Sequence, residues 1–169
     1  MNNSPKGFTL IELLLYVAIS AVILLATSMF LSVLLQSRVK NQTVAEVEQQ
    51  GLQVMQQITQ AVRNADTIIA PSPGIHGILL SVNTIAPGNN PTVFDLASGV
   101  VRIKEGGAAV VPLTNSRVTV SGLIFSNLTR SGTPGTIRVR FTITRVNATG
   151  RNEYSFSKTF IGAATLRQP

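Results

Sequence analysis

The chain of 169 residues is basic, with 14 lysines and arginines against 7 acidic residues and a net charge of +7. It contains no cysteine, which excludes disulfides, thiolate catalysis and cysteine-ligated zinc. From Val100 onward, ten basic residues face two acidic ones, a net charge of +8 that favours anionic partners such as nucleic acid, cell-wall polymers or an acidic protein subunit.

A short polar segment with one basic residue, Lys6, precedes a long apolar run. Phe8–Leu35 holds 28 residues, of which only Glu12 is charged. About 20 apolar residues suffice to cross a bilayer as a helix, which satisfies its own backbone hydrogen bonds in lipid. The sequence therefore predicts a membrane-spanning helix over Phe8–Leu35. A carboxylate inside lipid is costly, which indicates a functional role for Glu12.

The start of this run has a specific pattern. Gly7-Phe8-Thr9-Leu10-Ile11-Glu12 resembles the prepilin motif of type IV pilins and of type II secretion pseudopilins. The resemblance implies a leader of residues 1–7, removed by a prepilin peptidase between Gly7 and Phe8, and N-methylation of Phe8. It also implies that Glu12, the fifth residue of the mature chain, pairs in the filament with the α-amino group of a neighbouring subunit.

Two other interpretations of the run compete with this resemblance. A cleaved secretory signal has an apolar core of about 7–15 residues followed by a cleavage site. The run is longer, and its only candidate site, Ala18-Ile19-Ser20, falls in the middle. The second alternative is a single-pass anchor that does not polymerise, which explains the length of the run and the position of Lys6. This alternative leaves Glu12 unexplained.

Residues 36–66 continue the helix with an amphipathic pattern. Apolar residues recur every three to five positions, and glutamines occupy other faces. We expect one helix from about Thr9 to about Ala65, with a second half that packs on a sheet. Gly51 is its weak point, because glycine costs about 1 kcal/mol relative to alanine in a helix. This position permits a bend or close packing.

Residues 67–169 read as a small antiparallel β-domain. Alternating apolar residues and turn signals predict a bulge at Gly122 and strands over Ile75–Val82, Thr92–Leu96 (at an edge), Val100–Glu105, Ala108–Leu113, Arg117–Leu128, Thr136–Val146 and Glu153–Ile161. The expected fold class is α+β: a long N-terminal helix, membrane-spanning in its first half, packed on an antiparallel sheet. The pilin resemblance implies the same architecture.

The residues do not suggest an enzyme or a cofactor. The single histidine, His76, has no nearby acidic partner in sequence and reads as a surface or turn residue. The acids beyond residue 66 are the well-separated Asp95, Glu105 and Glu153. Calcium needs about six oxygen ligands, so we expect no metal site.

Basic residues on the C-terminal strands form a second candidate site. Arg138 and Arg140 alternate with apolar residues on one strand, and Lys158 lies on the next, so the three could line one exposed stripe. Together with Arg145 they form a candidate anion- or DNA-binding face, because phosphate contacts dominate such binding. No aromatic residue interleaves with the arginines for base stacking. The competing interpretation is a solvated face that keeps the sheet soluble.

We therefore interpret the chain as a structural filament subunit that is anchored in the cell membrane by one span, with its C-terminal domain outside the cytoplasm. Its expected partners are other pilin or pseudopilin subunits, the prepilin peptidase and the assembly platform of a pilus or secretion machine. The segment 48–65 resembles the post-membrane helix of J-type minor pseudopilins and W-type minor pilins, which favours a minor subunit. A DNA-binding competence pilin and a non-polymerising anchored protein remain the alternatives.

Overall fold

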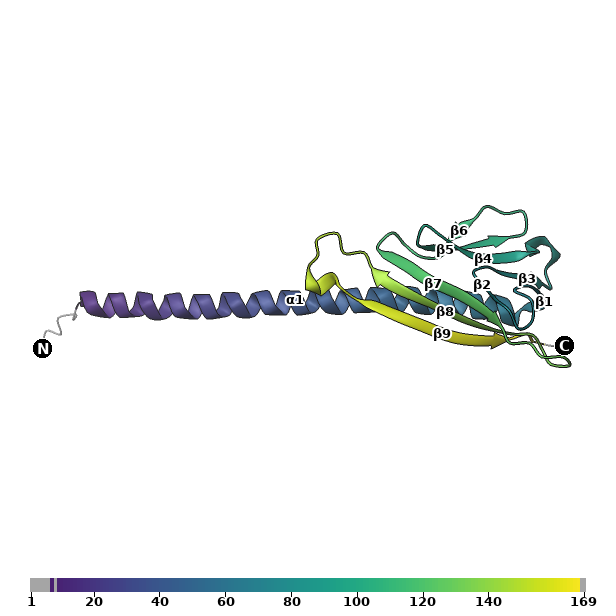
Figure 1. Cartoon of the computed structure of the whole chain (residues 1–169). Coiled ribbons are helices and arrows are strands. Elements are labelled where there is room, and N and C mark those ends of the chain that lie inside the picture. The colour runs from purple at the N-terminus through teal and green to yellow at the C-terminus, as the bar shows by residue number, and fades with distance from the viewer. Residues whose placement is uncertain (1–6, 8, 168–169) are drawn as a thin grey trace, which may run out of the picture. The chain divides into compact units, whose positions relative to one another are not determined.

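The computed structural model describes Gly7 and residues 9–167, and the chain divides into two compact units, Met1–Lys40 and Asn41–Pro169 (Figure 1). Helix α1 (Leu10–Arg63) contributes to both units and contains 54 residues. The prediction of one helix from Thr9 to Ala65 is therefore confirmed, although the helix ends two residues earlier. Within the first unit its apolar side chains are exposed.

In the second unit, α1 presents one buried stripe. It consists of Thr43, Val47, Gly51, Val54, Ile58 and Val62. The spacing of three or four residues places these positions on one face of the helix. Leu52, on another face, is 63% exposed. The amphipathic pattern that the glutamine-rich sequence predicts therefore corresponds to a real core face.

Within the described residues, nine strands form two antiparallel sheets, and the α+β fold class is confirmed. Sheet A joins, in this order, β1 (Ala65–Ala70), β3 (Leu80–Thr84), β4 (Thr92–Ala97), β5 (Val100–Glu105) and β6 (Val111–Pro112). Sheet B joins β2 (His76–Gly77), β7 (Val118–Asn127), β8 (Thr136–Arg145) and β9 (Ser157–Thr165). Two short 3-10 helices, Pro87–Asn89 and Asn152–Tyr154, occupy loops.

Strands β7, β8 and β9 form the meander that the sequence predicts, and they lie along the C-terminal part of α1 (Figure 1). On β8, four apolar side chains alternate with polar ones and are at most 1% exposed: Ile137, Val139, Phe141 and Ile143. The Phe141 ring stacks on Phe160 of β9, with centroids 5.4 Å apart. The register between β7 and β8 shifts at Gly122, whose φ of 61° confirms the predicted bulge.

Several strand predictions were wrong in the first half of the domain. The run Ile75–Val82 is two strands in different sheets, since β2 pairs with β7 and β3 pairs with β1 and β4. Strand β1 begins at Ala65, where the sequence predicted the end of the helix and no strand. The segment predicted as an edge strand, Thr92–Leu96, is central in sheet A. The pairing of β2 with β7 joins segments far apart in the chain, whereas the strands β1, β3, β4 and β5 pair with segments close by in sequence.

Two return strands also differ from their predicted bounds. Only Val111 and Pro112 of the expected strand Ala108–Leu113 pair with β5. The last strand begins at Ser157, because Asn152–Tyr154 forms a 3-10 turn, and it continues to Thr165. The guanidinium of Arg151 lies 5.9 Å from the centroid of the Tyr154 ring.

Gly51 is a packing position, within a continuous helix. A Cβ at this residue would overlap the ring of Phe160. One helical turn later the glycine is on the strand and the large side chain is on the helix. A Cβ at Gly162 of β9 would overlap the sulfur of Met55. Each glycine leaves room for a large side chain of the facing element, so helix and strand pack closely.

Ion pairs join the same two layers. Glu46 pairs with Arg145, and its other oxygen lies 3.7 Å from Nη1 of Arg117. Glu48 pairs with Lys158 at 2.6 Å. The Arg145 side chain is only 16% exposed, and its Nε is buried without a hydrogen-bond partner among the described residues, so Arg145 depends on Glu46 for compensation.

We predict that Gly51→Ala destabilises the second unit despite its better helix propensity. Overpacking against Phe160 costs about 1–3 kcal/mol, which exceeds the gain of about 1 kcal/mol from alanine in a helix. Thermal unfolding of the full chain in neutral detergent, followed by circular dichroism, measures the difference. Gly107→Ala is the matched control, since a Cβ at this residue would meet no atom within 4 Å. A Gly51→Ala protein as stable as the wild type would contradict this packing.

We also predict that removal of the Glu46 carboxylate destabilises the second unit more than removal of the Glu48 carboxylate. Glu46→Ala leaves the largely buried Arg145 charge without its partner and should lower the free energy of unfolding by about 1–3 kcal/mol. Glu48→Ala breaks a pair whose side chains are both 44% exposed. That change should cost less than about 1 kcal/mol. The same unfolding measurement ranks the two variants, and the reverse order would refute the role of Glu46.

Candidate functional site

The predicted processing site begins at Gly7, which is exposed and lies outside any helix or strand. Phe8, the predicted first residue of the mature chain, lies outside the described residues. Helix α1 begins at Leu10, directly after this junction. The predicted cleavage position therefore precedes the first residue of the helix, Leu10.

Glu12 closes a capping box with Thr9. The Thr9 backbone N–H and its hydroxyl donate to Oε2 of Glu12 at 3.1 and 3.0 Å. The Glu12 backbone N–H donates back to Oγ1 of Thr9 at 3.3 Å. This reciprocal arrangement satisfies backbone donors that a helix start leaves without partners. The Thr-x-x-Glu spacing is the sequence signal for such a box, and the sequence-based prediction did not use it.

The capping box does not involve the predicted leader. All of its atoms belong to Thr9 and Glu12, so removal of residues 1–7 leaves every one of its hydrogen bonds in place. The carboxylate is thereby supplied with donors from its own chain. A polar group in an apolar environment is tolerated when it is hydrogen-bonded in this way.

Beyond Glu12, α1 exposes an unbroken apolar surface within the first unit. Leucine, isoleucine, valine, methionine and phenylalanine side chains between Leu13 and Leu35 are about half to two-thirds exposed. Among the described residues, α1 is long and apolar enough to cross a membrane, and none of its most apolar stretch is buried in the protein. Such a surface requires lipid or other apolar helices around it.

The four basic residues predicted to share one face lie on both sides of sheet B. Arg138 and Arg140 are exposed on the side opposite to the core. Arg145 and Lys158 lie on the helix side and pair with Glu46 and Glu48. The prediction that Lys158 shares one exposed stripe with Arg138 and Arg140 was therefore wrong. Lys158 pairs in register with the buried Ile143, and directly opposed residues share a face.

His76 has a partner that the sequence did not predict. Its Nδ1 lies 2.9 Å from Oγ of Ser126 on the neighbouring strand β7. These two residues line a hollow of about 380 Å³ together with Arg138, Arg140, Ile124 and Ile161. The hollow brings two of the predicted basic residues together with His76, which is exposed and which the sequence predicted to be a surface or turn residue.

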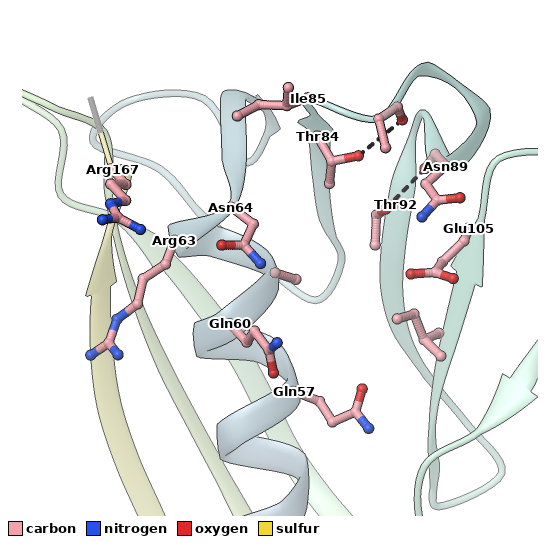
Figure 2. A pocket seen from close by; sticks show the side chains of 13 residues that line it. Gln57, Gln60, Arg63, Asn64, Thr84, Ile85, Asn89, Thr92, Glu105 and Arg167 are labelled. Atoms are coloured by element: carbon pink, nitrogen blue, oxygen red, sulfur yellow. Dashed lines mark hydrogen bonds between the residues drawn. The ribbon is translucent and has the colours of Figure 1, made fainter. Parts of the chain in front are cut away.

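A second hollow of about 530 Å³ lies beside the C-terminal end of α1 (Figure 2). The side-chain amides of Gln57 and Gln60 on α1, and of Asn64 just after it, lie on one side, and Thr92 and Glu105 lie on the sheet A side. Its composition suits hydrogen bonding to a polar group. The sequence contained no signal for it, because its walls come from segments far apart in the chain.

Two of the acids considered as metal ligands are engaged with arginines. Asp95 accepts two hydrogen bonds from Arg102, at 2.8 and 2.6 Å. These bonds raise the pKa of Arg102. Glu153 pairs with Arg151. The two carboxylates therefore have structural partners, and Arg102 remains charged at any physiological pH.

Comparison with known families identifies the N-terminal segment. Residues 2–28 match the family model of the prokaryotic N-terminal methylation motif. No curated protein and no solved structure matches the chain significantly. The match covers Gly7, Thr9 and Glu12, together with most of the exposed apolar helix. The chain therefore carries the N-terminal signature of type IV pilins and pseudopilins.

Proposed function

We propose that this protein is a subunit of a type IV pilus-like or type II secretion filament. The methylation motif at residues 2–28 supports a pilin- or pseudopilin-type subunit. Under this proposal a prepilin peptidase cleaves between Gly7 and Phe8 and methylates the new N-terminus. The observation that carries the proposal is the capped Glu12 at the start of an exposed apolar helix, directly after the processing motif.

Glu12 acts in two environments under this proposal. In the membrane, Thr9 supplies donors to the carboxylate and so lowers the cost of holding it in lipid. In the filament, the same carboxylate pairs with the α-amino group of Phe8 of a neighbouring subunit. Two charges that meet inside an apolar helix bundle are tolerable only as a pair, so this contact sets the axial register.

The charge of the chain supports a minor subunit. Removal of residues 1–7 deletes Lys6, and the mature chain keeps a net charge of +6. Many copies stacked in one filament would repel one another. A basic subunit is better placed among acidic neighbours or at one end of a filament. The J-type or W-type assignment remains a proposal that rests on the pattern of residues 48–65.

We predict that Glu12→Gln abolishes assembly without blocking processing, because glutamine cannot form the ion pair with the N-terminal amine. The measurement is the amount of subunit in sheared filaments from native cells, together with the N-terminal mass. Glu48→Gln removes a carboxylate from the second unit and should assemble normally. A chain recovered with Met1 intact would overturn the proposal in favour of a non-polymerising anchored protein.

We further predict that Thr9→Val weakens the start of α1, whereas Thr9→Ser preserves it. Valine has no hydroxyl to cap the helix, and loss of an N-cap of about 1 kcal/mol corresponds to roughly fivefold faster opening. Amide hydrogen exchange of residues 10–13 in neutral detergent measures the effect. Equal exchange in both variants would show that the capping box does not stabilise this helix start.

A further inference from the structure

The outer face of sheet B aligns its polar residues in rows. His76, Ser126 and Arg138 are successive register partners on β2, β7 and β8. The next row contains Ile124, Arg140 and Ile161 on β7, β8 and β9. Because directly paired residues project to the same side, Arg138 lies in one row with two polar residues and Arg140 lies between two isoleucines.

The charges of this face have no internal compensation. The strands of sheet B contain no acidic residue. The cations on the inner side, Arg145 and Lys158, each have a glutamate partner on α1. Arg138 and Arg140 have no ion pair among the described residues, although they lie only two positions apart on one strand. An external anion can therefore neutralise both without competing with a carboxylate of this face.

The face is also hollowed at this point. Six residues line a pocket of about 380 Å³: His76, Ile124, Ser126, Arg138, Arg140 and Ile161. The hydrogen bond between His76 and Ser126 fixes the imidazole at one end. This volume lies in the range of sites for small molecules. The pocket combines guanidinium groups, an imidazole and a hydroxyl with two aliphatic side chains.

These groups select the class of ligand. Guanidinium groups donate several N–H bonds in a geometry that matches phosphate oxygens. The three phenylalanines of β7, β8 and β9, Phe125, Phe141 and Phe160, are buried in the core, so these strands place no phenylalanine, tyrosine or tryptophan ring on the outer face for a nucleobase to stack on. We propose that this pocket binds the phosphate group of an aliphatic phosphate ester, with Ile124 and Ile161 against its carbon chain.

Isothermal titration calorimetry of the full chain in neutral detergent with glycerol 3-phosphate tests the proposal. We expect saturable binding that weakens at least about tenfold in Arg138→Gln and in Arg140→Gln, because each loses charge-assisted hydrogen bonds. Both residues are exposed and should leave the thermal unfolding temperature unchanged. Phosphatidylglycerol in the micelle is the second arm, and tighter binding there identifies a lipid headgroup as the source of the ester.

The matched control is Arg130→Gln, which removes the same charge from an exposed loop outside the pocket. It should bind glycerol 3-phosphate as the wild type does. Equal weakening in all three variants would overturn the proposal in favour of general charge attraction. Absence of saturable binding would overturn it as well. If a single-stranded oligonucleotide binds more tightly than glycerol 3-phosphate and loses affinity in the same two arginine variants, the proposal of an aliphatic ligand is overturned.

Discussion

The close packing of α1 on β9 is the contact on which the second unit depends. Gly51 makes room for Phe160, and Gly162 makes room for Met55. A glycine on each element therefore accepts a large side chain from the other, and the two backbones approach more closely than two rows of large residues would allow. This approach also brings Glu46 and Glu48 within reach of Arg145 and Lys158. The apolar and ionic contacts of the interface thus reinforce one another.

The N-terminal part of the chain follows a different constraint, that of polar groups in an apolar surrounding. A helix that exposes only apolar side chains is stable in lipid, but its first backbone donors have no partners inside the helix. The capping box gives the backbone N–H groups of Thr9 and Glu12 hydrogen-bond partners. One of these partners is the Glu12 carboxylate, which we also propose to form the ion pair of filament assembly. One residue therefore stabilises the helix start and, under our proposal, also pairs with a neighbouring subunit in the filament.

Sheet B separates two kinds of basic residue that look alike in the sequence. On the inner side a cation must be paired, because it is partly buried against the helix. On the outer side a cation is solvated and can remain without a partner. Arg138 and Arg140 are of the second kind, and they flank a hollow that also contains His76 and Ser126. A binding role on this face is separable from the filament assembly that we propose for the N-terminal helix.

Local patterns determined a large part of this protein. The apolar run, the amphipathic stripe, the alternation on β8 and the bulge at Gly122 all depend on near neighbours in the chain, so the sequence predicted them correctly. The methylation motif is likewise a local pattern, because its residues lie within a few positions of one another. The sequence by itself therefore indicates the class of protein.

Only the tertiary structure decided which distant segments meet. It divided Ile75–Val82 between two sheets, placed β4 at the centre of sheet A and turned Lys158 and Arg145 toward the helix. The strand register brought His76 to Ser126 and both to Arg138, although about 50 and 60 residues separate His76 from them along the chain. Strand pairing at such separation depends on the global burial of apolar faces, and no window of sequence contains that information.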